Sequence, residues 1–296
     1  MTLYTLQEVN IRKTYFFLFI FLILVITLGW FLSYVFADNT ILIAAVILSV
    51  FSALYSYWNS DKVILSLSGA KPATKDNFPE LFRIVENLSI TAGLPTPKIY
   101  VIEDDSPNAF ATGRDPQHSA ICVTIGLLRL LEKSELEGVI AHELSHIGNR
   151  DILLMSIVVI LVGIVGLLSR WFISGVRWRD NRRSEGGQIL LLLGLIMIIL
   201  APLTATLLKL AISRKREFLA DATGALLTRY PEGLAKALEK ISQYPYSMKN
   251  ANTATAHLFI VNPFRGKERK SWLTRLFMTH PPVEERIKAL RQMSIG

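Results

Sequence analysis

The residues best suited to chemistry lie in the pentapeptide His142-Glu143-Leu144-Ser145-His146. Two histidines four residues apart on a helix share one face, so both imidazoles can reach the same metal ion. A zinc ion bound by such nitrogens lowers the pKa of a water molecule that it coordinates. A glutamate between the two histidines is placed to accept the proton of that water. The pentapeptide therefore predicts a zinc-peptidase site with Glu143 as general base.

A single helix must carry both histidines if they are to bind one ion. Ser134 and Glu137 have the spacing of a helix capping box. Apolar residues then recur at helical spacing, at Leu136, Val139, Ile140, Leu144 and Ile147. A chance pair of surface histidines is the alternative, and it is disfavoured because the chain has only five histidines. The pattern therefore predicts one helix that presents both imidazoles on the same face.

Two histidines leave a catalytic zinc ion one protein ligand short. Glu217 and Asp221 are four residues apart and would share a helix face. One carboxylate could bind zinc while the other accepts the free N–H of a ligand histidine. Arg214 and Lys215 are adjacent, so a solvated helix with ordinary charge pairs is the alternative. The residues alone leave these two interpretations open.

Four long apolar stretches account for a hydrophobic content of 51% and a mean hydropathy of +0.38, at about 15–36, 41–58, 152–168 and 189–210. Each approaches or exceeds the roughly 20 residues that cross a bilayer core. The first is too long for a signal-peptide core, which favours a retained anchor. We therefore expect a multi-pass membrane protein in which two membrane hairpins, 1–58 and 152–210, alternate with the two parts of a protease domain, 59–151 and 211–296.

Basic residues predict the orientation of these stretches. Arg12 precedes the first stretch and Lys62 follows the second, so the positive-inside rule places 59–151 in the cytoplasm. The loop 169–188 disagrees, because it carries five arginines and faces the outer side if the third and fourth stretches both cross. A re-entrant hairpin is the alternative there. We expect four spans and a cytoplasmic catalytic domain.

Charge and cysteine content exclude other classes of protein. A net charge of +8 and a pI near 9.6 could suggest a nucleic-acid partner. The charge is concentrated at the borders of the apolar stretches, so membrane anchoring is the simpler cause and no nucleic-acid partner is predicted. The single cysteine, Cys122, excludes an internal disulfide and a cysteine-rich zinc finger. It is expected to pack as a small apolar side chain.

The remaining segments predict an α+β protein that is mainly helical and has a small β-sheet. Helices are expected over 79–92, 214–227, 232–244 and 282–291, and strands over 98–102, 108–113 and 119–124. The strand 108–113 is expected at an edge, where an extended substrate could add as a further strand. The stretch 245–279 is expected to be rich in loops, and the acidic residues 103–105 are expected to form a solvated loop.

Four motifs in this order resemble the HtpX family of membrane-bound zinc metalloendopeptidases, and more distantly the prenyl-protein (CAAX) proteases of the same superfamily. They are P-N-A-F-A-T-G (107–113), H-E-L-S-H-I-G-N-R-D (142–151), S-R-K-R-E-F-L-A-D (213–221) and T-H-P-P-V-E-E-R-I (279–287). The likeness covers most of the chain. It implies a gluzincin-type zinc protease domain, one zinc ion per chain, a location in the cell membrane, and polypeptide substrates. Damaged or misfolded membrane proteins are the implied targets, in quality control and stress response.

The resemblance also implies a role for each matching residue near the metal. His142, His146 and Glu217 match the zinc ligands, and Glu143 matches the general base. Asp221 matches a residue that orients a ligand histidine.

Three further residues match outside the metal helix. Asn108 is implied to hold the substrate backbone, and His280 and Arg286 are implied to be catalytic, near the oxyanion and the ligand carboxylate. On their own, Asn108 is more often a turn residue and His280 could cap a helix. No role is assigned to His118 or His257, since a lone histidine is usually structural or exposed.

Three functions compete at this point. The first is a zinc endopeptidase that opens at the cytoplasmic face of the membrane. The second is an intramembrane protease, but the charged residues at 132, 133, 135 and 137 make a metal helix inside the bilayer costly. The third is a catalytically silent membrane scaffold, and the intact Glu143 argues against it, because a purely structural zinc site does not need a base.

Overall fold

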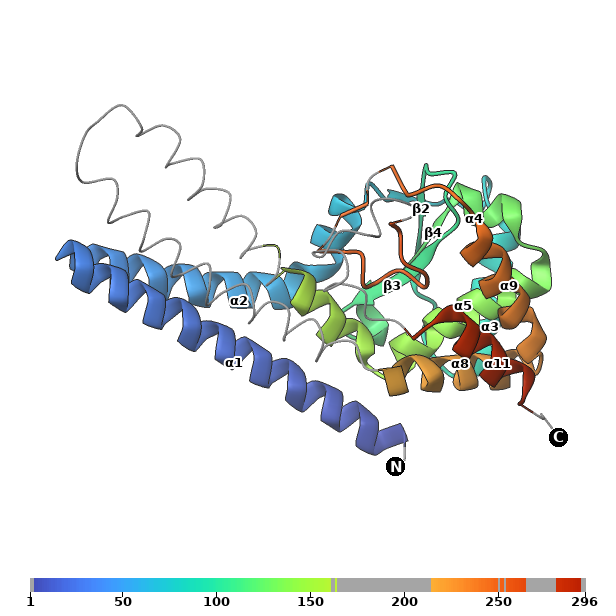
Figure 1. The fold of residues 1–296 in the computed structure, drawn as a ribbon, viewed down its shortest axis with the longest axis horizontal. Helices are drawn as coiled ribbons and strands as arrows, with labels where there is room; N and C mark the ends of the chain where they lie inside the picture. Colours follow the sequence, from blue (N-terminus) through green and yellow to red (C-terminus); the bar gives the residue numbers. More distant parts are fainter. Residues whose placement is uncertain are drawn as a thin grey trace.

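In this computed structural model, a helical hairpin extends from a unit in which helices enclose a small sheet (Figure 1). The structure describes residues 3–160, 163, 214–249, 251–252, 254–264 and 281–293. The predicted span 189–210, the loop 169–188 and His280 lie outside these residues.

The hairpin consists of α1 (Leu3–Phe36) and α2 (Asn39–Leu67). Asp38 caps α2, because its carboxylate accepts a hydrogen bond from the backbone N–H of Thr40 at 2.9 Å. Both helices are long and apolar enough to cross a membrane, judged by length and composition alone. These are the first two of the four predicted apolar stretches.

Helix α2 does not end at Trp58, where the second apolar stretch was predicted to end. It continues to Leu67, with a non-helical backbone at Asn59. The part beyond Asn59 belongs to the protein core, because Ile64 is buried in one cluster with Phe110 of the sheet. Packing against the sheet therefore extends the helix past the apolar run that the sequence showed.

The sheet has four strands in the order β1-β2-β4-β3. These are β1 (Lys71–Pro72), β2 (Lys98–Ile102), β3 (Ala109–Gly113) and β4 (Ser119–Thr124). β2 and β4 are parallel, while β1 and β3 run antiparallel to their neighbours. The three predicted strands are confirmed, and β3 lies at an edge as expected. β1 was not predicted, because two residues are too few to show a strand pattern.

Alternate residues of the strands face two different clusters of apolar side chains. Ala111 and Ile121 belong to the cluster that contains the apolar residues of α3 (Pro79–Ala92), α5 (Lys133–Gly148) and α9 (Pro231–Gln243). Phe110 and Cys122 belong to the opposite cluster, with the end of α2. Both faces of the sheet are therefore buried, and Cys122 packs as the predicted apolar residue.

The predicted helices agree with the observed ones to within one residue at each end that can be compared. Besides α3 and α9, these are α8 (Arg214–Thr228) and α11 (Val283–Arg291). Gly93 ends α3 in the left-handed conformation, with φ of 65°, which favours glycine because it has no Cβ. Two short helices were not predicted, α4 (Ile125–Leu130) and the 3-10 turn Pro116–His118.

The predicted capping box of α5 is wrong by two residues. The backbone N–H of Glu132 donates to the carboxylate of Glu135 at 2.9 Å, so this pair replaces Ser134 and Glu137 at the start of the helix. Glu135 also accepts a hydrogen bond from Lys240 of α9 at 2.8 Å. A contact with a distant helix therefore decides between two local motifs that the sequence could not separate.

The helix Asp151–Ile160 is the described part of the predicted third span. All of its residues are buried. Ile157 packs with Phe21 of α1, and Val158 packs in the cluster of Phe110. This segment therefore contacts the hairpin on one side and the sheet on the other.

The described part of 245–264 consists of turns and irregular chain, as predicted, yet it is largely buried. It also corrects the expectation of a solvated loop at 103–105. Asp104 is only 3% exposed, and it accepts hydrogen bonds from the backbone N–H groups of Ser106 at 2.9 Å and Lys249 at 2.7 Å. Asp104 is therefore a buried anchor for the segment that follows α9.

Helices α5 and α8 approach closely at a glycine. A Cβ at Gly224 would lie 3.0 Å from the backbone nitrogen of His142 and 3.2 Å from the carbonyl carbon of Ala141. This close approach brings Glu217, two turns earlier on α8, towards the histidines of α5.

We expect Gly224→Ala to lower the midpoint of thermal unfolding, because overpacking typically costs about 1–3 kcal/mol. The control is Gly148→Ala at the end of α5, where a Cβ would meet a side-chain atom of Leu94 at 3.5 Å. That variant should unfold at the same temperature or higher, since alanine favours a helix over glycine by up to about 1 kcal/mol. Equal midpoints for the two variants in detergent would contradict the close approach.

Candidate metal centre

Three potential ligand atoms converge from α5 and α8. The Nε2 atoms of His142 and His146 lie 3.2 Å apart. The carboxylate of Glu217 lies 3.9 Å from Nε2 of His142 and 3.7 Å from Nε2 of His146. The three ligand atoms lie within 4.8 Å of one another, and all three residues are buried. The structure therefore brings together the three residues that the sequence singled out as ligands.

The other nitrogen of each imidazole faces a buried carboxylate. Nδ1 of His142 lies 3.0 Å from Asp221, and Nδ1 of His146 lies 3.1 Å from Asp151. A carboxylate at this position holds the ring in one orientation and favours the tautomer with its proton on Nδ1. Both Nε2 atoms are thereby directed to the same point, as metal-binding histidines require.

Each of these aspartates contacts an arginine. Nε and Nη2 of Arg286 donate to the two oxygens of Asp221 at 2.8 and 2.6 Å. Nε of Arg216 lies 2.8 Å from Asp151. Charge-assisted contacts of this length compensate for the loss of water around a buried carboxylate. The site is therefore supported by two His–Asp–Arg chains of similar design.

The first of these chains keeps its histidine neutral. Burial by itself raises the pKa of Asp221, but the charge and hydrogen bonds of Arg286 outweigh it and lower that pKa to about 2. Burial lowers the pKa of His142 to about 4, against the opposing hydrogen bond of Asp221. His142 is therefore uncharged at pH 7, with the lone pair of Nε2 available.

His146 behaves differently because its neighbours are acidic. Burial lowers the pKa of His146, but the hydrogen bond to Asp151 and the charge of Glu217 more than reverse this and raise it to about 9. A proton and a metal ion compete for the same nitrogen lone pair. Surroundings that favour a proton on His146 therefore also favour a metal cation between the ligand atoms.

Glu143 lies between the two histidines and is only 1% exposed. Its burial raises the pKa of the carboxyl to about 7, although a hydrogen bond from the backbone of Ala111 opposes this shift. A carboxyl group with a pKa near the working pH can both accept and return a proton. Through Ala111 the same group adjoins the edge strand β3.

The match to known families agrees with this arrangement. The model of Peptidase family M48 matches residues 75–294, which contain all three ligand candidates and Glu143. The chain belongs to peptidase family M48. The protein is therefore a metalloprotease, a hydrolase that acts on polypeptides and uses a metal cofactor.

Individual relatives cover almost the whole of this M48 chain. A "Protease HtpX homolog" of Caldanaerobacter subterraneus subsp. tengcongensis is 48% identical and covers 99% of both chains. A "Protease HtpX homolog" of Pyrococcus furiosus is 47% identical over 86% of this chain and 87% of its own. The resemblance inferred from the four motifs is confirmed.

A solved structure has a similar fold. The crystal structure of S. mikatae Ste24p matches with a TM-score of 0.51 and 20% sequence identity. The match covers 97% of this chain and 66% of that one. At this identity the likeness concerns the fold alone.

Asn108 immediately precedes β3 and contacts the protein's own backbone. Its amide donates to the carbonyl of Val261 at 2.8 Å and accepts from the N–H of Val261 at 3.3 Å. The N–H of Ile260 donates to the carbonyl of Ala109 at 3.0 Å. Residues 260–261 therefore occupy part of the β3 edge where an extended substrate was expected.

The expected oxyanion contact of Arg286 does not fit its surroundings. Arg286 is fully buried, and besides its two bonds to Asp221 it donates from Nη1 to the carbonyl of Ile260 at 3.0 Å. Nη1 also lies 3.6 Å from Glu217. Arg286 therefore does lie near the ligand carboxylate, as the resemblance implied, but its donors are directed to protein groups. His280, the other expected catalytic residue, lies outside the described residues.

Two residues of the site escaped the sequence analysis. Asp151 lies five residues beyond His146, after the end of the predicted helix. Helix geometry therefore gave no reason to expect its carboxylate beside the imidazole of His146. Arg216 was noted as a part of a motif only. Both belong to the matched motifs, so their place in those motifs was the available signal. The two histidines without an assigned role, His118 and His257, are not in the metal cluster.

We expect Arg286→Ala to lower the stability of the protein by about 3–5 kcal/mol, because it leaves Asp221 buried without its cation. The matched control is Arg291→Ala on the same helix, where the guanidinium is exposed and pairs with Glu232 and Glu239. That change should have little effect, since water screens exposed ion pairs. Thermal unfolding of both variants tests this, and similar losses of stability would contradict a special role for Arg286.

Proposed function

We propose that the protein is a zinc-dependent endopeptidase anchored in the cell membrane. The observation that carries this proposal is the convergence of His142, His146 and Glu217 beside Glu143. Two imidazole nitrogens and one carboxylate are the donor set of many catalytic zinc sites, and three protein ligands leave a fourth position for water or substrate. The donor set therefore fits one zinc ion per chain.

Charge supports the same assignment. The described residues around the site bury four carboxylates, on Glu143, Asp151, Glu217 and Asp221, against two guanidinium groups, on Arg216 and Arg286. When the carboxylates are ionised and both histidines are neutral, as metal ligands must be, two negative charges remain in a poorly solvated region. The proton that His146 holds without a metal compensates only one of them. A divalent cation matches that charge.

In the proposed mechanism, Glu143 handles the proton. A zinc ion held by His142, His146 and Glu217 would supply Lewis acidity towards water and the substrate carbonyl. Glu143 accepts a proton from the attacking water at its carboxylate, and then delivers it to the nitrogen of the departing amine. Asp221 and Asp151 hold the two imidazoles in place by their contacts with Nδ1. Arg286 holds Asp221, so we propose a positioning role for it in place of an oxyanion contact.

The edge strand β3 is the proposed binding site for an extended substrate. Ala111 of this strand donates its backbone N–H to Glu143, so a chain that adds along β3 passes the base. Because Val261 occupies the amide of Asn108, direct contact between Asn108 and a substrate requires residues 260–261 to move. We propose that Asn108 contributes by holding these residues beside the substrate. His280 stays a proposed catalytic residue on the strength of its motif.

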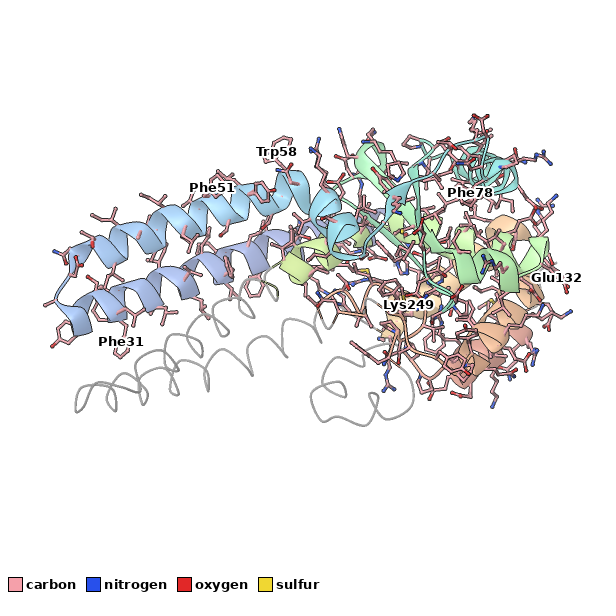
Figure 2. All side chains as sticks on the ribbon, turned by 90° about the horizontal axis from the view of Figure 1, so that it is seen from above. Phe31, Phe51, Trp58, Phe78, Glu132 and Lys249 are labelled. Carbon is pink, nitrogen blue, oxygen red and sulfur yellow. The ribbon has the colours of Figure 1, made fainter. Side chains whose placement is uncertain are left out.

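The hairpin of α1 and α2 is the proposed membrane anchor. Large apolar side chains cover its outer surface, among them Phe51 with 64% and Trp58 with 56% exposure, and both point away from the hairpin (Figure 2). Such a surface is stable in lipid rather than in water. We propose the division into 1–58, 59–151, 152–210 and 211–296, with both hairpins in the membrane and the catalytic parts in the cytoplasm.

Membrane proteins that are damaged or misfolded are the proposed substrates. The damaged state is proposed from the resemblance alone. The choice of membrane proteins is supported by the helix that follows the metal helix α5, Asp151–Ile160, because its Ile157 packs against Phe21 of α1. A segment released from the bilayer would meet the site without leaving the membrane surface.

Chelation should abolish cleavage of casein by the detergent-solubilised protein, and added zinc should restore it.

Glu143→Gln should keep zinc but lose turnover by about 10²–10⁴-fold, because an amide cannot accept the proton. Glu217→Gln should lower zinc content instead. Glu137→Gln, a change at a partly exposed position on the same helix, serves as the control with normal activity. Activity that survives exhaustive chelation would exclude the metallopeptidase mechanism.

Labelling of single cysteines in intact membranes should place the tip of the hairpin and the catalytic unit on opposite sides. In a Cys122→Ala background, Lys249→Cys should react with an impermeant maleimide from the cytoplasmic side and Asn39→Cys from the other side. Both positions are exposed. Reaction of both from one side would contradict a crossing hairpin. Ser174→Cys tests the second hairpin. If this cysteine reacts only from the cytoplasmic side, the second hairpin is re-entrant and does not contain two spans.

A further inference from the structure

Asn10 of α1 contacts the metal site from outside the catalytic unit. This asparagine is only 5% exposed. Its amide nitrogen donates to Asp151 at 2.7 Å and to the carbonyl of Asn149 at 3.0 Å. The side-chain oxygen Oδ1 of Asn10 accepts a hydrogen bond from Nη2 of Arg216 at 3.2 Å. One side chain of the hairpin therefore bonds to Asn149 and Asp151, just after α5, and to Arg216 in the first turn of α8. Figure 1 shows the N-terminal end of α1 near the start of α8.

The contact with Asp151 leads directly to a ligand histidine. One carboxylate oxygen of Asp151 faces Nδ1 of His146 at 3.1 Å. The other oxygen receives Asn10 at 2.7 Å and Arg216 at 2.8 Å. With both oxygens engaged and no exposure to solvent, the carboxylate cannot rotate without losing a charge-assisted bond. Asn10 therefore acts on the orientation of His146 through a single intermediate.

Comparison of the two His–Asp–Arg chains explains why an asparagine is needed. Arg286 binds Asp221 through both Nε and Nη2. Arg216 directs Nε to Asp151 but Nη2 to Asn10. The amide of Asn10 then donates to the oxygen of Asp151 that also receives Arg216. It supplies the second donor that Arg286 provides by itself in the other chain.

We infer that Asn10 is a positioning residue for the proposed zinc site, acting on His146 through Asp151. The inference rests on the proposed function, since it assigns the support of a zinc ligand to the membrane anchor. Asn10 lies outside residues 75–294, the part matched by the family model. In this chain the hairpin is thus a structural part of the metal centre as well as an anchor.

Zinc affinity of the full-length protein in detergent, measured by competition with a chelator, tests this. Asn10→Ala should weaken binding about tenfold, the lower end of the range for residues that orient a metal ligand. The control is Thr14→Val, because Thr14 is also buried, one turn along the same helix, and its hydroxyl donates to the backbone carbonyl of Asn10 at 2.9 Å rather than to the side-chain amide. Thr14→Val should bind zinc within twofold of the unmodified protein. Equal losses in both variants would overturn the inference in favour of a general loss of packing.

A double-mutant cycle separates a positioning role from a structural one. Asp151→Asn should weaken zinc binding by about 10–100-fold. If Asn10 acts through Asp151, adding Asn10→Ala to that variant should change the affinity less than twofold, because coupled residues are not additive. A further tenfold loss would mean that Asn10 acts independently of Asp151 and would overturn the proposal.

The cobalt(II) form offers a readout that overall stability does not move. The visible absorption bands should change in Asn10→Ala and stay unchanged in Thr14→Val, since they report ligand geometry. If Asn10→Ala does not fold, Asn10→Ser takes its place, because its shorter side chain cannot reach Asp151 in the same position. If the unmodified protein binds zinc and both Asn10 variants bind it equally well, this inference is refuted while the proposed function stands. Failure of the unmodified protein to bind zinc would instead refute the proposed function.

Discussion

The rest of the structure depends on the compensation of buried charge around the two histidines. Carboxylates removed from water cost several kcal/mol each unless cations and hydrogen-bond donors replace the solvent. Four of them surround this site, and two arginines provide only part of the compensation among the described residues. Each arginine comes from a different helix, Arg216 from α8 and Arg286 from α11. The charge requirement therefore draws separate parts of the chain to one point. With both histidines neutral, as metal ligands, it leaves a deficit of positive charge that suits a divalent ion.

This constraint links the fold to the proposed chemistry. Gly224 lets α8 approach α5 until Glu217 reaches the histidines, and Arg286 ties α11 to both Asp221 and the carbonyl of Ile260. Residues 260–261 in turn lie along β3, the strand that hydrogen-bonds to Glu143. A change at any one of these contacts would therefore alter the positions of the base Glu143 and of the metal-ligand candidates. Binding of a metal ion is expected to stabilise the whole arrangement, because metal affinity and folding are coupled when ligands come from distant elements.

Local patterns predicted much of this arrangement. The spacing of His142 and His146 and of Glu217 and Asp221 follows from helix geometry, and in each case the two residues do share a face. The end of α3 at Gly93 was equally local. The predictions that were wrong concern contacts with distant segments. The cap of α5 moved because Glu135 pairs with Lys240, and residues 103–105 are not all solvated because Asp104 binds the backbone of Lys249.

The sequence by itself therefore determined which side chains share a helix face or a strand, and which family they belong to. Periodicity and spacing report the geometry of a backbone over a few residues, so they are reliable at that range. Only the tertiary structure decided which buried charges become partners. Asn10 is separated from Asp151 by 141 positions, and Arg286 is separated from Asp221 by 65. No local pattern encodes such pairs, because the energy of a buried charge depends on whatever side chains the folded chain brings into contact with it.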